Sequence, residues 1–328
     1  MRVSSPARRS SPTAGSCRAC MTRPDAMAEP VSIGSIECVA DVGAALGEGP
    51  LWDPRAKRLI WVDIKGDRIF RFDPVSGRTE EWSCDGMTSA IGLADAGGYV
   101  SAARHGFFLL DLDDAGGGVR RRALADPEAD APGNRFNDGK VDPAGGFWAG
   151  TMDDAERETT GAWWRLSPDG AATRLAACFR VTNGPAFDPT RGRVFMTDSA
   201  RRTIFVAETE GAAPGELGVF RTFGDGDGYP DGMEIDAEGC LWVAFWDGGA
   251  VRRFSPDADL LQTVDLPVPR PTSLAFAGAD IFVTSARIGL DAAALDAAPL
   301  SGALFRIRTD RPIGGPAAYF RAGAILEN

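Results

Sequence analysis

The chain has 328 residues, of which 44% are apolar and 25% charged, and its formal net charge is −11. This composition permits one large hydrophobic core, and β-repeat folds of such length often form a single domain. The acidic balance argues against a nucleic-acid partner or an anionic membrane, because both select a basic surface. No run of 18 apolar residues occurs, so the sequence does not predict a transmembrane helix.

Residues 1–32 are predicted to form a disordered N-terminal tail, followed by one folded domain at residues 33–328. The tail is rich in Ser, Arg and Pro and lacks the hydrophobic region of a secretory signal. A targeting segment and an upstream start are the alternative interpretations. Without an export signal, a cytoplasmic location is expected, with the six cysteines reduced.

Six segments share a pattern in which a short apolar run ends before a turn, in five cases with Asp. The segments are Glu48–Asp53, Ala90–Asp95, Asn137–Asp142, Asn183–Asp188, Asp231–Asp236 and Thr272–Ala277. They recur at intervals of roughly 41 to 48 residues, a period typical of propeller blades. We therefore predict an all-β fold, a six-bladed β-propeller with the apolar faces of neighbouring blades packed together. A β-sandwich would not explain the shared register as well.

Runs of β-branched and aromatic residues between polar turns predict two further strands in the repeats. The clearest are Arg58–Asp63 with Arg68–Phe72, Arg193–Thr197 with Thr203–Ala207, and Cys240–Phe245 with Ala250–Phe254. The best helix candidate is Leu290–Ala298. A closed ring needs a strand from one terminus to complete a blade at the other, and the candidates are Ser35–Val39 and Ala317–Phe320.

Equivalent positions of the blades face one another around a propeller axis, so the first residues of the repeats should converge on a central channel. Among them, Glu48, Asn183 and Asp231 offer two carboxylates and one amide oxygen, a hard ligand set suited to Ca²⁺, Mg²⁺ or Mn²⁺. Three protein ligands leave coordination positions open for water and substrate. The sequence thus predicts a central metal site, with turn capping at strand starts as the alternative.

Three other kinds of site need residues or motifs that this sequence does not contain. The only histidine is His105 and no Gly-x-Ser-x-Gly motif occurs, which argues against a Ser-His-Asp hydrolase. Zinc sites rich in histidine or thiolate fail for lack of ligands. The segment Gly224–Gly228 lacks the lysine of a phosphate loop and the spacing of a calcium loop, so a flexible loop is expected.

Several specific blocks of sequence together carry a family resemblance. These blocks are Leu46–Pro50 with Trp61–Ile64, Asn134–Pro143 with Ala149–Met152, Thr182–Pro185, and Pro230–Met233 with Leu241–Ala244. From about Ser35 to Gly323, the chain resembles the regucalcin (senescence marker protein)/gluconolactonase family of six-bladed propellers.

That resemblance implies roles for five residues. Glu48, Asn183 and Asp231 match the family's divalent-metal ligands, and Arg135 and Asn137 match the residues that hold its substrate. The family's usual chemistry is the opening of sugar lactones to aldonic acids. From the residues alone, Arg135 could instead be a structural ion-pair partner and Asn137 a turn cap.

One departure from the family concerns an acidic substrate contact. In regucalcin-like members this acid follows the Gly-Thr-Met block, where an ungapped match places Ala155, with Asp153, Asp154 and Glu156 nearby. The contact is therefore unassigned. Trp246 and the loop at residues 153–160 are expected either at the mouth of the pocket or in blade packing and solvent-exposed turns.

The sequence predicts a metal-dependent lactonase of gluconolactonase type that hydrolyses sugar (aldono)lactones. Asp231 is the expected catalytic residue, taking the proton of the attacking water and returning it to the departing ring oxygen. One divalent cation is expected, with Ca²⁺ preferred over Zn²⁺, Mn²⁺, Mg²⁺ or Fe²⁺. The expected partner is a small sugar lactone, and the protein a monomer or small homo-oligomer.

Three other functions are compatible with the same fold. The main alternative is a calcium-binding regulatory propeller of the regucalcin type without lactonase turnover, because it would use the same ligands. A protein-interaction propeller has no reason to place carboxylates at matched positions of different blades. A hydrolase of phosphotriesters or other esters would be distinguished only by its substrates.

Overall fold

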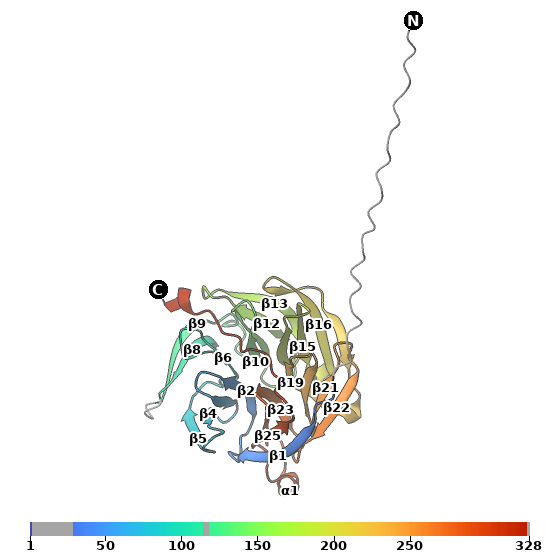
Figure 1. Ribbon diagram of the computed structural model, residues 1–328. Coiled ribbons are helices and arrows are strands. Elements are labelled where there is room, and N and C mark those ends of the chain that lie inside the picture. Colours follow the sequence, from blue (N-terminus) through green and yellow to red (C-terminus); the bar gives the residue numbers. More distant parts are fainter. Residues whose placement is uncertain (2–28, 114–117, 327–328) are drawn as a thin grey trace.

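The computed structural model describes Met1, residues 29–113 and residues 118–326. Most of the predicted tail, residues 2–28, therefore lies outside the described residues, and its disorder stays a prediction. Within the described residues, the strands form six antiparallel sheets arranged radially about one axis (Figure 1). The predicted all-β, six-bladed β-propeller is confirmed.

Each blade begins with the strand closest to the axis, and these innermost strands contact one another around the channel. They are β2 (Gly47–Asp53), β6 (Ala90–Leu93), β10 (Asn134–Val141), β14 (Thr182–Asp188), β19 (Tyr229–Ile235) and β23 (Pro271–Ala277). Each contains the first residue of a repeated segment, and β2, β14 and β23 contain the whole segment. The blades are numbered 1 to 6 in this order.

The second and third strands of the blades form hairpins whose positions match the predicted pairs. The second strands are β3 (Arg58–Asp63), β7 (Tyr99–Ala103), β11 (Phe147–Asp153), β15 (Arg193–Asp198), β20 (Leu241–Trp246) and β24 (Asp280–Ser285). The third strands are β4 (Arg68–Phe72), β8 (Gly106–Leu112), β12 (Gly161–Leu166), β16 (Thr203–Glu210), β21 (Ala250–Phe254) and β25 (Leu304–Thr309).

The outer strands are more exposed than the inner ones. They are β5 (Thr79–Ser83), β9 (Val119–Ala125), β13 (Ala172–Phe179), β18 (Gly218–Thr222), β22 (Leu260–Asp265) and β1 (Ile33–Ala40). The remaining short elements are β17 (Ala213–Pro214), the helices α1 (Ala292–Ala297) and α2 (Gly323–Leu326), and the 3₁₀ turns η1 (Ser199–Arg201) and η2 (Asp225–Asp227). The helix α1 lies inside the predicted range Leu290–Ala298.

The ring is closed by a strand from the N-terminal side of the chain. Strand β1 pairs antiparallel with β25 and so completes blade 6, which confirms Ser35–Val39 as a closing strand. The other candidate, Ala317–Phe320, does not complete a blade. Phe320 instead forms an isolated parallel bridge with Ala94 at the base of blade 2.

The hydrophobic core is divided among the interfaces between blades. In the described part of the chain, each pair of neighbouring blades has its own buried cluster. At the ring-closing interface, Phe282 and Leu304 of blade 6 pack with Leu59 and Trp61 of blade 1. Because each blade packs on two neighbours, the inner strands are fixed in position from both sides.

The Asp residues that end the repeats have a structural role. Asp142 accepts hydrogen bonds from the indole of Trp148 at 2.9 Å and from Arg165 Nε at 2.6 Å. The same arrangement recurs in blade 5 with Asp236, Trp242 and Arg253. These buried pairs secure the turn between the first two strands, at the face opposite the first residues of the repeats.

The chain after β25 crosses that opposite face as a strap of residues 314–326. The strap runs from blade 5, where Gly314 bridges Asp236, to blade 2, where the amide of Phe320 donates to Leu93 at 2.7 Å. Figure 1 shows this segment passing across the propeller towards the C-terminus beside β9. The Phe320 side chain is fully buried between blades 2 and 3.

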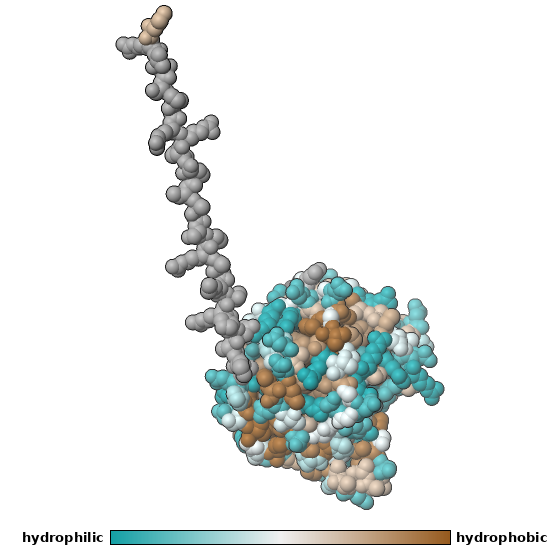
Figure 2. Space-filling model, turned by 90° about the vertical axis from the view of Figure 1, so that its right-hand side faces the viewer, coloured by the Kyte–Doolittle hydropathy of each residue, from teal (hydrophilic) through white to brown (hydrophobic). Residues whose placement is uncertain are grey.

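The outer surface is mostly hydrophilic on the side that Figure 2 presents, with separate apolar groups between polar ones. Large exposed apolar side chains include Val75, Val219 and Leu260, which belong to different blades. No helix among the described residues is long and apolar enough to cross a membrane.

Replacing Phe320 with Ala should destabilise the protein by about 3 to 5 kcal/mol, because it leaves a cavity between two blades. Urea unfolding followed by circular dichroism measures this. Ala317→Ser, an exposed change in the same strap, is the matched control and should shift the free energy of unfolding by no more than about 0.5 kcal/mol. Equal effects of the two changes would show that the strap is not packed as described.

Candidate functional site

The innermost strands are irregular at the position where the predicted site residues lie. The register with the next strand shifts in five of the six blades, between Glu48/Leu51, Phe136/Gly139, Asn183/Ala186, Pro230/Met233 and Pro271/Ser273. Such bulges redirect side chains and are frequent beside active sites. The predicted ligands thus sit at bulges inside strands rather than at the turn caps of the alternative interpretation.

Glycine permits two of these irregularities. Gly49 follows Glu48 with φ +52°, and Gly184 follows Asn183 with φ +91°. Both values lie in the left-handed region, which is unfavourable for residues with a Cβ atom.

A cavity of about 530 Å³ opens at this end of the channel. Four predicted site residues from four blades line its buried part: Glu48, Asn137, Asn183 and Asp231, each no more than 8% exposed. Arg135, which is 3% exposed, lines it as well. The structure therefore brings all five predicted site residues together.

A hydrogen-bond chain connects the amide side chains. Arg135 Nη1 donates to Asn137 Oδ1 at 2.6 Å, and Asn137 Nδ2 donates to Asn183 Oδ1 at 2.9 Å. Asn183 Nδ2 then donates to Ser199 Oγ at 2.8 Å, and Ser199 donates to the carbonyl of Pro230 at 2.6 Å. The chain fixes the Asn183 amide with its oxygen towards Asn137, and it ends next to Asp231. Sequence reasoning missed Ser199.

Three carboxylates share the buried end of the channel. Burial, together with repulsion from Asp138, raises the pKa of Glu48 well above its ordinary value. Burial raises the pKa of Asp231 in the same way, with further contributions from Glu48 and Asp138. For Asp138, burial raises the pKa to about 6, although the amides of Gly139 and Gly184 donate to it.

No Lys or Arg within residues 29–113 and 118–326 forms an ion pair with Glu48, Asp138 or Asp231. The cation next to Asp138 in sequence, Lys140, pairs with Glu234 at 2.6 Å instead. Buried carboxylates ordinarily have a positive partner, a metal ion or a raised pKa. Sequence reasoning missed Asp138, although it directly follows Asn137.

The donor set fits a hard divalent cation. Glu48, Asn183 and Asp231 present carboxylate and amide oxygens to the cavity, whereas both carboxylate oxygens of Asp138 accept backbone amides. No group of three His, Cys, Asp or Glu among the described residues is arranged to hold a metal ion. A cation site here would therefore depend on the two carboxylates together with the Asn183 amide.

The acidic residues after the Gly-Thr-Met block have three different surroundings. Asp154 accepts a hydrogen bond from Arg135 Nε at 2.7 Å and also forms ion pairs with Lys65 and Arg104. Glu156 lines the cavity, while Asp153 accepts the backbone amides of residues 157 and 158. The acidic side chain placed to touch a ligand is thus Glu156, one position beyond Ala155.

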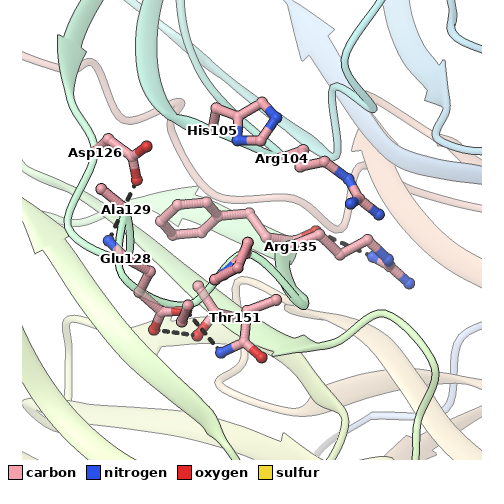
Figure 3. Close-up of a pocket in the computed structure, with 11 residues that line it drawn as sticks. Arg104, His105, Asp126, Glu128, Ala129, Arg135 and Thr151 are labelled. Carbon is pink, nitrogen blue, oxygen red and sulfur yellow. Dashed lines mark hydrogen bonds between the residues drawn. The ribbon is translucent and has the colours of Figure 1, made fainter.

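A second, smaller cavity of about 120 Å³ lies on the other side of Arg135. Figure 3 shows the guanidinium groups of Arg104 and Arg135 on one side, away from Glu128, which accepts a hydrogen bond from Thr151 at 2.7 Å. His105 lines this cavity and not the larger one. It lies in the turn between β7 and β8, as the sequence predicted.

The fold and cavity define a six-bladed propeller with an acidic, buried channel end. Residues 46–287 match the family described as SMP-30/Gluconolactonase/LRE-like region. The chain belongs to this family, as its sequence motifs predicted.

Among its relatives, the 6-deoxy-6-sulfogluconolactonase of Pseudomonas putida is 36% identical over 283 residues, covering 85% of this chain and 96% of that protein. Regucalcin of Xenopus laevis is 34% identical over 284 residues, covering 83% of this chain and 93% of that protein. The crystal structure of a calcium-binding protein, regucalcin, from Agrobacterium tumefaciens has a TM-score of 0.81 at 29% identity, covering 87% of this chain and 96% of that one.

The raised pKa values predict how stability depends on pH in a chelating buffer. The unfolded chain loses the Asp231 and Glu48 protons near their ordinary pKa values of 3.8 and 4.5, whereas the folded protein keeps them to higher pH. The folded state therefore binds more protons above those values, and its stability falls as the pH rises through the raised pKa values. Urea unfolding from about pH 4.5 to 7.5 measures this slope.

Asp231→Asn should flatten that slope, because it removes one of the titrating carboxylates. Each unit of pKa separation accounts for about 1.4 kcal/mol. Asp247→Asn at the rim is the control and should leave the slope unchanged. Parallel slopes for wild type and Asp231→Asn would contradict the described charge cluster.

Proposed function

We propose that this protein is a divalent-cation-dependent hydrolase that opens sugar lactones to aldonic acids. The observation that carries this proposal is a group of three buried carboxylates that form no ion pair with any described Lys or Arg, beside a cavity that is also lined by Arg135. The relative named as a lactonase supports the reaction class. A cytoplasmic location and a monomer or small homo-oligomer stay predictions.

Glu48, Asn183 and Asp231 are the proposed ligands of one cation. Ca²⁺ is the first candidate because all three ligands are hard oxygens, and Zn²⁺, Mn²⁺, Mg²⁺ and Fe²⁺ are the others. When bound, such a cation would polarise the lactone carbonyl and offset the charge that develops on its oxygen.

Arg135 and Asn137 are the proposed substrate-binding residues. Arg135 Nε and Nη1 are occupied by Asp154, Asn137 and the carbonyl of Phe136. Its Nη2 has no hydrogen-bond partner among the described residues, so this donor is available to a sugar oxygen. The amide group of Asn137 donates both of its hydrogens, one to the carbonyl of Thr182 and one to Asn183 Oδ1. Its Oδ1 accepts one hydrogen bond, from Arg135, and retains a second lone pair for a sugar hydroxyl.

Asp231 is the proposed general base and acid. Its carboxylate accepts a proton from the attacking water while the water oxygen bonds to the carbonyl carbon. When the ring C–O bond breaks, the same proton passes to the departing ring oxygen. The product is an open-chain aldonic acid, which loses its own proton to solvent.

A calcium-binding regulatory propeller is the second candidate, since the regucalcin neighbour is described as a calcium-binding protein. It would use the same three ligands. The Nη2 of Arg135, which has no hydrogen-bond partner among the described residues, favours the hydrolase, because ion binding alone does not require a hydrogen-bond donor on a residue that lines the cavity.

Asp231→Ala should lower kcat for gluconolactone by at least about 1000-fold, because it removes both a ligand and the proton carrier. Acid release with added Ca²⁺ measures the rate, and circular dichroism checks the fold. Asp247→Ala, a rim carboxylate paired with Arg270, is the matched control and should retain most of the activity. Substantial turnover by Asp231→Ala with bound cation would exclude this role.

Glu48→Gln should weaken Ca²⁺ binding by at least about tenfold, because it removes one of two charged ligands. Calorimetric titration measures the affinity without reference to catalysis, and the Ca²⁺-dependent rise in Tm gives a second measurement. Asp247→Asn again serves as control. An unchanged affinity would place the cation elsewhere.

A further inference from the structure

The cavity has a wall whose positive charge is not balanced. We define the cationic wall as Lys65, Arg135 and Arg180, which all line the cavity. These side chains come from blades 1 and 3 and from the segment that leads into blade 4, and they converge on the loop at residues 154–156. Three separate parts of the chain thus bring their cations to one side of the cavity.

Asp154 is shared by two of the three wall cations, Lys65 and Arg135, and its carboxylate also pairs with Arg104, which lines the smaller cavity. Arg180 lines the cavity, yet its Nε and Nη2 donate only to the backbone carbonyl of Glu156, at 3.0 and 2.8 Å.

The net charge of the wall is positive. Arg180 has no carboxylate partner among the described residues, and the only other acid that lines this side is Glu156. Three cations therefore face two carboxylates, Asp154 and Glu156, and Asp154 is also neutralised by Arg104 from the smaller cavity. Asp153 is directed to backbone amides instead.

The opposite side of the cavity is balanced. Arg270 pairs with Asp247 at 2.6 Å and lies over the ring of Trp246 at 4.6 Å from its centroid. In a six-bladed ring, blades 5 and 6 face blades 2 and 3, so this neutral, aromatic side lies across from the cationic wall. The buried end between them carries the unpaired carboxylates Glu48 and Asp231.

This distribution of charge around the cavity favours a ligand whose reacting end meets the buried carboxylates and whose other end meets the cationic wall. The reacting ester must reach Glu48 and Asp231, so the part of a sugar lactone far from the ester extends along the wall. Resting on the lactonase function proposed above, we propose that the substrate is a sugar lactone with an anionic substituent, a sulfonate, phosphate or carboxylate, far from the ester. Arg180, which has no carboxylate partner among the described residues, binds that substituent together with Lys65, which is half-buried and pairs with Asp154 alone. Arg135 is buried and held by both Asp154 and Asn137.

The residue types suit this role. An Arg side chain presents parallel N–H donors that match the oxygens of a sulfonate or phosphate, and Lys adds a mobile point charge. Lys65 and Arg180 are half-buried and exposed respectively, so both can adjust to a substituent without a change in the strands.

Turnover of matched lactones tests the proposal. The probes are gluconolactone, its 6-phosphate, its 6-deoxy-6-sulfonate and the C6 carboxylate glucarolactone, each assayed with Ca²⁺. Wild type should favour at least one charged lactone by about tenfold or more in kcat/KM, and the preferred group identifies the source of the charge. Equal kcat/KM for charged and neutral lactones overturns the inference while the lactonase function stands.

Two variants connect the preference to the wall. Arg180→Gln and Lys65→Met should each reduce the ratio of kcat/KM for charged over neutral lactone by about 10- to 100-fold, mainly through KM. Arg157→Gln, an exposed arginine of the same loop that does not line the cavity, is the matched control and should keep the ratio. A ratio unchanged in both wall variants overturns the assignment.

A binding measurement separates this inference from the catalytic proposal. Calorimetry with the Ca²⁺-loaded protein should give at least about tenfold tighter binding of 6-phosphogluconate than of gluconate, and Arg180→Gln should abolish the difference. Absence of turnover with this difference intact would contradict the lactonase function alone. Equal binding of the two acids overturns the anionic subsite.

Discussion

The burial of three carboxylates at the channel end, without an ion pair to any described Lys or Arg, is the constraint on which the rest of the structure depends. Glu48, Asp138 and Asp231 are buried together, although desolvation and mutual repulsion both oppose their ionised forms. Such a group persists only in a framework that cannot relax around it. The propeller supplies that framework, because every inner strand is held by two neighbouring blades and β1 closes the ring.

Most of the fold could be predicted because it repeats. The period of the segments gives six blades, and runs of β-branched and aromatic residues between polar turns give strands such as Arg58–Asp63 at their observed bounds. The convergence of Glu48, Asn183 and Asp231 follows from the same register. These features are local or periodic, so they are visible in a single sequence.

The rest of the site depends on contacts between blades, which a single sequence does not show. The bulges could not be predicted, since they appear only when an inner strand is paired with its neighbour. Asp154 joins cations that are 50 and 89 positions away, Arg104 and Lys65. Likewise, nothing near Phe320 in sequence indicated that it packs between blades 2 and 3 instead of closing the ring.

The strap across the opposite face has a consequence for traffic through the molecule. No residue of the strap lines the main cavity, whose walls come from the other face alone. The cavity therefore opens on one face of the propeller, and the strap lies on the other. In the proposed hydrolase, cation, water, lactone and acid would all use the entrance on that one face. A newly formed acid would then leave past the same side chains that admitted its precursor, so features that speed capture would also slow departure.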